Sequence, residues 1–283
     1  MKIAVFTSNQ PRHRALIASL ANIADECHAI VECKTVHPGK IADFYKESAV
    51  MQDYFSRVID AERHVFGDVG YISGVNVMPL RRGDLSLMTR KQLAPALDAD
   101  IFVVFGSSVI KGWLIDELVA RRAVNIHMGM SPYYRGSSCN FWALHDGHPY
   151  LVGATVHLLS AGVDSGDILY NVVPSVDGCR DAFDFSMATV RAAHRSVVDR
   201  IVSGELARLA PVRQDRTREL RYSRNADFSD AVASRFLADA PDIATISARL
   251  DEEQRSSLYP LVAGYREVSD CPAGTVALDR TLG

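Results

Sequence analysis

The chain has 283 residues, of which 48% are hydrophobic, so it can bury a sizeable core in one large domain or two modest ones. Its formal net charge is -3, and Arg residues are interleaved with Asp and Glu along the chain. This charge pattern disfavours a dedicated RNA or DNA binder, because such a protein needs a strongly basic surface for the phosphates.

The first 127 residues alternate short apolar runs with amphipathic stretches. This alternation predicts parallel β-α-β units with right-handed crossovers, in which ligands bind beyond the carboxyl ends of the strands. We expect strands at 2–6, 27–33, 75–80, 101–106 and 123–127. Helices are expected at 15–24 and 113–122, and the stretch 41–66 is expected to form one or two helices. A further helix is expected to end at about residue 100.

The pattern changes after residue 153. The segment "GATVHLLSAGVDSGDILYNVV" predicts two β-segments joined by a loop rich in Gly and Asp, which is typical of a hairpin. A helix is expected over 181–202, and beyond 204 we expect an ordered loop, a helix and a less regular tail. The sequence therefore predicts an α/β fold: a Rossmann-like, mostly parallel twisted sheet flanked by helices, with a smaller, partly helical C-terminal region. We place the main domain at 1–204 and the C-terminal extension at 205–283.

Asn125 and His127 stand two residues apart at the end of a predicted strand. Their side chains therefore point to the same face, where α/β proteins bind ligands. An amide and an imidazolium are both hydrogen-bond donors, and two donors aimed at one point suit a developing oxyanion. Asp164, on the loop "AGVDSGD", is free to approach and hold the imidazole charged. Taken alone, a His at a strand end is more often a hydrogen-bonded residue than a catalytic one.

Two motifs together resemble the family of 10-formyltetrahydrofolate-dependent formyltransferases, which includes the glycinamide ribonucleotide, methionyl-tRNA and sugar-nucleotide N-formyltransferases. "NIHMGMSPYYRG" is similar to the family's N-x-H-x-S-L-L-P-x-x-x-G, and "GATVHLLSAGVDSGDIL" to its G-x-T-x-H-x(6)-D-x-G. The resemblance is strong over about 101–170. It implies the formyltransferase fold and places the family's catalytic Asn, His and Asp on Asn125, His127 and Asp164. In one departure, the family's S-L-L-P is replaced by Gly129, Met130, Ser131 and Pro132.

The resemblance also implies two binding regions. The pterin of 10-formyltetrahydrofolate, the co-substrate, is expected between the loop after the fourth strand and the loop before Asp164, at Phe105, Gly106, Ser107, Ser108, Val109, Ile110, Ser160, Ala161, Gly162 and Val163. The loop after the first strand opens a helix, a geometry that attracts phosphate. We expect the acceptor there and at the altered turn, at Ser8, Asn9, Gln10, Arg12 and Arg135, although Arg12 also fits a solvent-facing position.

The predicted reaction is transfer of a formyl group to the primary amine of a small molecule, with a nucleotide-linked amino-sugar as the first choice. The segment after residue 204 is too short and too evenly charged for the basic RNA-binding barrel expected of a methionyl-tRNA enzyme. Methionyl-tRNA and an N-hydroxyornithine-type amine stay open as alternative acceptors. So do a hydrolase that transfers the formyl group to water and a non-catalytic folate- or nucleotide-binding relative.

The five cysteines are scattered and form no CxxC pair, so the sequence indicates neither a disulfide framework nor a bound metal. The apolar run at the N-terminus is too short for a signal peptide, and no run reaches membrane-spanning length. We therefore expect a cytoplasmic protein without membrane or nucleic-acid partners. A homodimer stays open.

Overall fold

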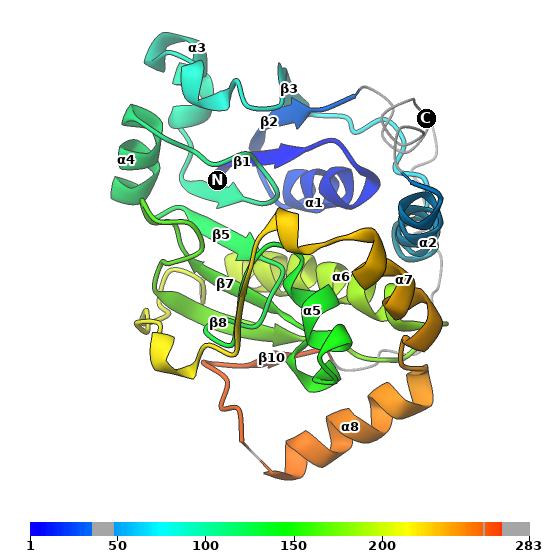
Figure 1. Ribbon diagram of the computed structural model, residues 1–283. Coiled ribbons are helices and arrows are strands. Elements are labelled where there is room, and N and C mark those ends of the chain that lie inside the picture. The colour runs from blue at the N-terminus through cyan, green and yellow to red at the C-terminus, as the bar shows by residue number, and fades with distance from the viewer. Residues whose placement is uncertain (36–47, 257, 268–283) are drawn as a thin grey trace, which may run out of the picture.

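A central sheet organises the molecule in the computed structural model, which describes residues 1–35, 48–256 and 258–267 (Figure 1). Within these residues the sheet has eight strands in the order β10-β8-β7-β5-β4-β1-β2-β3. They are β1 (Lys2–Ser8), β2 (Glu26–Cys33), β3 (Val75–Arg81), β4 (Ile101–Val104), β5 (Val124–His127), β7 (Ala154–Leu158), β8 (Ile168–Val173) and β10 (Tyr265–Arg266).

Neighbouring strands from β3 to β5 are parallel, as the alternating sequence pattern predicted. Strand β7 is antiparallel to both β5 and β8, which confirms the predicted hairpin, and β10 joins β8 in parallel. A second sheet pairs β6 (Tyr134–Gly136) with β9 (Arg221–Ser223). The predicted mostly parallel α/β sheet is therefore confirmed.

Helices and short turns connect these strands. The α-helices are α1 (Pro11–Ala21), α2 (Ala49–Phe66), α3 (Arg90–Leu97), α4 (Trp113–Ala120), α5 (Cys139–His145), α6 (Ala182–Val202), α7 (Asp230–Asp239) and α8 (Ile243–Ser256). The 3-10 turns are η1 (Leu85–Leu87), η2 (Pro149–Leu151), η3 (Arg216–Arg218) and η4 (Asn225–Asp227). Of the helices in the described part of the chain, none combines the length and the apolar character needed to cross a bilayer.

Alternate residues of β1 enter two different cores, because successive side chains of a strand point to opposite faces of the sheet. Ile3 and Val5 pack in the core that includes buried side chains of α1 and α6. Ala4 and Phe6 pack in the second core with α3 and α4. Burial on both faces explains why this strand reads as a continuous apolar run.

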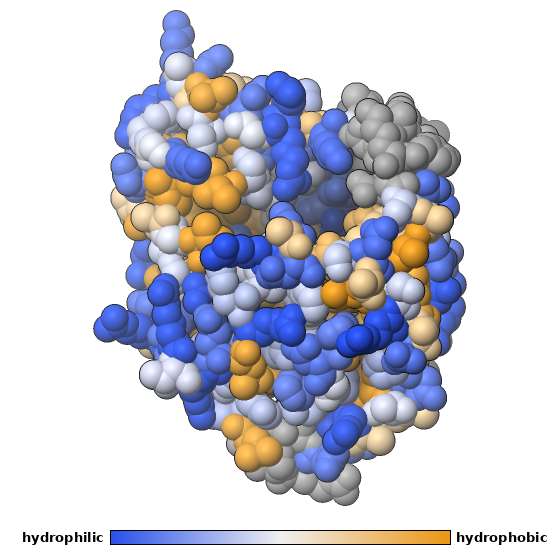
Figure 2. All heavy atoms as spheres, viewed as in Figure 1, coloured by the Kyte–Doolittle hydropathy of each residue, from blue (hydrophilic) through white to orange (hydrophobic). Residues whose placement is uncertain are grey.

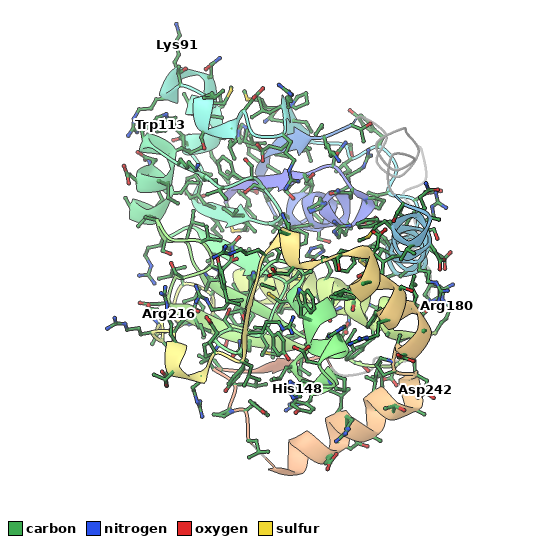
Figure 3. All side chains as sticks on the ribbon, in the orientation of Figure 1. Lys91, Trp113, His148, Arg180, Arg216 and Asp242 are labelled. Carbon is green, nitrogen blue, oxygen red and sulfur yellow. The ribbon has the colours of Figure 1, made fainter. Side chains whose placement is uncertain are left out.

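Helices α1, α2 and α6 contact one another and lie side by side in Figure 1. Arg180, labelled in Figure 3 at the edge of this layer, donates to Asp60 of α2 at 2.9 Å and to Asp184 of α6 at 2.7 Å. The sequence predicted one or two helices over 41–66; α2 fills 49–66, and 41–47 lie outside the described residues. Ser48 begins α2 by accepting a hydrogen bond from the Met51 amide.

The predicted extension packs against the first 204 residues at several places. Its strand β9 pairs with β6, β10 extends the central sheet beyond β8, and α7 contacts α2. The extension therefore contributes to both sheets, and the boundary at 204 stays a prediction from the sequence.

Candidate active site

A cavity of about 470 Å³, within the usual size of small-molecule sites, lies between the loop after β4 and the loop that joins β7 to β8. Asn125, His127 and Asp164 all line it. The same cavity is lined by all ten residues that the sequence predicted around the pterin, at 105–110 and 160–163. The fold thus brings together three segments that are far apart in the chain.

The position of Asn125 follows from the register of β5 and β7. Asn125 pairs directly with His157 in this antiparallel pair, so the two side chains are neighbours on one face. Asn125 Nδ2 lies 3.0 Å from His157 Nε2, and His157 Nδ1 lies 2.8 Å from the Leu158 carbonyl oxygen. Because a carbonyl can only accept, Nδ1 carries the proton and Nε2 accepts from the Asn125 amide. His157 therefore orients the amide group of Asn125.

His157 is suited to this role because it stays uncharged. Burial lowers its pKa to about 4. At neutral pH its Nε2 therefore keeps a lone pair for Asn125.

Asp164 lies on the loop that joins β7 to β8, and this loop brings its carboxylate close to Asn125 and His127 of β5. One carboxylate oxygen, Oδ1, lies 3.4 Å from His127 Nδ1 and 3.4 Å from Asn125 Nδ2. The backbone of Asp164 has φ +47°, a left-handed conformation that Asp tolerates better than most residues. Gln214 Nε2 donates to the carbonyl oxygens of Asp164 at 3.1 Å and of Gly166 at 2.7 Å. The sequence offered no signal for Gln214, which lies in the C-terminal extension.

The charges of His127 and Asp164 support each other. Burial opposes the charge on His127, but the adjacent Cys139 sulfur and Asp164 carboxylate raise its pKa to about 10. Burial likewise opposes the charge on Asp164, but the attraction of His127 holds its pKa below the usual carboxyl range. At neutral pH the pair is therefore an imidazolium and a carboxylate.

The altered turn after β5 is held by buried hydrogen bonds. Thr155 Oγ1 donates to the Gly129 carbonyl at 2.7 Å and accepts from the Ser131 amide at 2.9 Å. The turn then leads to Cys139, whose Sγ lies 3.6 Å from His127 Nε2 and lines the cavity. The sequence showed the changed turn but did not predict Cys139 at the site; the one signal for it is a cysteine close after that turn.

The cavity has an apolar rim and an aromatic wall. Val109 and Val163, on its two opposing loops, are 54% and 52% exposed. Figure 2 shows hydrophobic side chains, in orange, gathered beside α4 on the viewed face. The wall away from these loops carries aromatic rings from α2, α5, α6 and α7, namely Tyr54, Phe141, Phe183 and Phe236. Such a cavity suits flat, partly apolar ligands.

Five residues predicted to hold the acceptor are not among the described residues that line this cavity: Ser8, Asn9, Gln10, Arg12 and Arg135. Arg12 forms a 2.8 Å ion pair with Glu62 of α2, and Arg135 forms one of 2.7 Å with Glu219. The sequence did not indicate either pair, because the acids lie 50 and 84 residues away. Both guanidinium groups are thus neutralised within the chain.

Residues 1–201 match the formyl transferase family. The chain is 27% identical over 123 residues to a methionyl-tRNA formyltransferase from Synechococcus sp. (strain JA-3-3Ab); the aligned region is 44% of this chain and 38% of that protein. The chain therefore spans less than half the length of this curated relative.

Two solved structures share the fold. A Mycobacterium tuberculosis protein assigned as a sugar N-formyltransferase matches with a TM-score of 0.51 and 15% identity, over 88% of this chain and 85% of that one. An N-formyltransferase from Helicobacter canadensis, in complex with folinic acid and dTDP-3-aminofucose, matches with a TM-score of 0.50 and 13% identity, over 81% of this chain and 73% of that one.

Proposed function

The chain belongs to the formyl transferase family, and on this premise we propose that it transfers a formyl group from 10-formyltetrahydrofolate to a primary amine. The observation that carries the proposal is the cluster of Asn125, His127 and Asp164 on the wall of the cavity. Two donors and a carboxylate at one point are the groups that acyl transfer to an amine requires.

Each of the three residues has a separate role in the proposed reaction. The Asn125 amide and the His127 imidazolium donate hydrogen bonds to the oxyanion that forms when the amine attacks the formyl carbon. For this, Asn125 redirects the N–H that now faces Asp164 at 3.4 Å. Asp164 keeps His127 charged and takes part in moving the proton from the attacking amine.

The two loops that face each other across the cavity support a site for the folate. They offer backbone groups and the exposed valines Val109 and Val163, which pack against a flat ring while the backbone hydrogen-bonds its edge. We assign 105–110 and 160–163 to this part of the site.

For the acceptor we propose a nucleotide-linked amino-sugar. The aromatic wall formed by Tyr54, Phe141, Phe183 and Phe236 favours a ligand with flat or ring-shaped faces, because nucleobases stack on aromatic side chains. The relative from Helicobacter canadensis was solved with such an amino-sugar and a folate. The acceptor role of Ser8, Asn9, Gln10, Arg12 and Arg135 stays a prediction, and any part that these residues play lies outside the cavity described above.

The test is a formylation assay with 10-formyltetrahydrofolate and a panel of nucleotide-linked amino-sugars, with products detected by mass spectrometry. We expect at least one N-formylated product from the wild-type protein and almost none from Asn125→Ala. A reaction without amine serves as control, because formate release there would identify water as the acceptor. Absence of formylated product across the panel would eliminate the proposed acceptor class.

A further inference from the structure

Glu32, near the end of β2, is an acidic side chain that is only 1% exposed and is not among the described residues that line the cavity. Its carboxylate oxygens accept from two neighbouring segments. Oε2 accepts from the Ser108 amide at 2.5 Å, and Oε1 accepts from the Ser108 hydroxyl at 2.8 Å and from the Gly83 amide at 2.8 Å. Burying a carboxylate is costly unless its oxygens are hydrogen-bonded in this way.

Ser108 links this buried acid to the proposed folate site. It lies 76 residues from Glu32 in the chain, on the loop 105–110, and it lines the cavity. Its backbone N–H and its side-chain hydroxyl both donate to Glu32. The two donors are thus directed behind the loop and not into the cavity. Glu32 therefore fixes the position of a cavity residue without contacting the cavity itself.

The two ends of the same loop are also held from behind. At its start, Thr7 Oγ1 donates to the Phe105 carbonyl oxygen at 2.7 Å. Just after its end, the Lys111 amide donates to Ser86 Oγ at 2.9 Å. Neither Thr7 nor Ser86 is among the described residues that line the cavity. Glu32 thus holds the middle of a loop whose two ends are fixed independently.

We propose that Glu32 is a positioning residue for the folate, which holds Ser108, and with it the loop 105–110, in the conformation that binds the pterin. The proposal rests on the proposed formyl transfer, because it assigns Glu32 to the folate part of that site. Its physical basis is preorganisation. A loop that is already in its bound conformation does not have to be ordered at the expense of binding affinity.

Glu32→Met removes all the hydrogen bonds of the carboxylate and keeps a side chain of similar length. The Ser108 amide then lacks its buried acceptor, so the loop populates its binding conformation less. The Kd for folate rises by the inverse of the fraction that remains. We expect a rise of about 5- to 100-fold, the range that corresponds to leaving one buried donor without its partner. Turnover at saturating folate should stay close to the wild-type value, because bound folate holds the loop in place.

The test measures the Kd of folinic acid by calorimetry and turnover at saturating folate, on the full-length wild-type protein, Glu32→Met, Ser108→Ala and the double variant. Ser108→Ala removes the hydroxyl that donates to Glu32, so we expect a smaller rise in Kd. In the double variant we expect a Kd close to that of Glu32→Met, because the hydroxyl has already lost its partner. If Glu32 did not act through Ser108, the two effects would multiply.

Hydrogen exchange of the peptide that contains Ser108 reports on the loop without any ligand. We expect faster exchange in Glu32→Met than in the wild-type protein, because the Ser108 amide has lost its buried acceptor. Glu62→Met is the matched control. Glu62 is 4% exposed, accepts from the backbone and the guanidinium group of Arg12, and is not among the described cavity residues. We expect this variant to melt earlier but to keep the wild-type Kd.

Binding of folinic acid by the wild-type protein separates the two proposals. If that protein binds folinic acid and formylates an amine, but Glu32→Met binds equally well, the positioning role is wrong and the proposed function stands. An equal rise in Kd in Glu62→Met, or a loss of turnover at saturating folate in Glu32→Met, would have the same meaning. If the wild-type protein neither binds folinic acid nor formylates any amine, both proposals fail. If Glu32→Met does not fold, Ser108→Ala decides, since an unchanged Kd with unchanged exchange would overturn the positioning role.

Discussion

Replacing Asp164 with Asn removes one negative charge from the site and almost nothing else. Asn has the same shape, and its carbonyl oxygen can still accept the hydrogen bond from His127 Nδ1, which lies 3.4 Å from the carboxylate oxygen. The negative charge of Asp164 offsets the effect of burial on His127, so without it the pKa of His127 falls from about 10. An uncharged imidazole is a poor donor to an oxyanion. Since one such donor is worth about 2.7–4 kcal/mol, we expect turnover to fall about 10²–10³-fold.

The pH dependence of this variant has a definite sign. In the wild-type protein His127 stays protonated until the pH approaches 10, so the alkaline fall in activity begins late. In Asp164→Asn that fall moves to lower pH. In the unfolded chain the carboxyl has a pKa of about 3.9 and the imidazole a pKa of about 6.5. The ion pair contributes its full stabilisation to the fold when the pH lies between these two values. The stability difference between wild type and variant is therefore largest between these values and shrinks on both sides, as Asp164 is protonated in acid and His127 loses its proton in base.

The assay compares steady-state kinetics of the wild-type protein, Asp164→Asn and Asp167→Asn across pH, with thermal melts over the same range. Asp167 is the matched control, because it lies in the same loop but is exposed and does not line the cavity. We expect wild-type kinetics from Asp167→Asn. Near wild-type turnover by a folded Asp164→Asn protein, or an unmoved alkaline limb, would refute the reasoning.

Three further substitutions test the surroundings of the site. Gly129→Ala places a Cβ 2.6 Å from Cys139 Cβ; we expect about 1–3 kcal/mol lower stability from overpacking and a loss of turnover, read from thermal melts and kinetics. Gln214→Ala leaves the carbonyl of Asp164 without its partner, so turnover should fall and unfolding by urea should show about 1–3 kcal/mol less stability. Leu118 is a fully buried residue of α4, so Leu118→Ala should lower the stability measured by urea unfolding by about 2–5 kcal/mol. Binding of a folate analogue should be unchanged, and weaker binding would contradict this separation of core and site.

Much of the fold could be predicted from the sequence because its signals are local. Runs of apolar residues marked strands covered on both faces, and the loop rich in Gly and Asp marked the hairpin of β7 and β8. The two-residue repeat of a strand put Asn125 and His127 on one face. The small strands β6 and β9 were not predicted, because three residues carry no periodicity.

The sequence by itself thus determined the α/β architecture and three side chains that meet at one cavity, since strand periodicity and short loops act over a few residues. Only the tertiary structure decided which groups surround them. His157 faces Asn125 through the register of two strands, Cys139 reaches His127 across the turn at Gly129, and Arg12 is neutralised by an acid on a helix 50 residues away. These contacts depend on how whole elements pack, and no local pattern of residues encodes that packing.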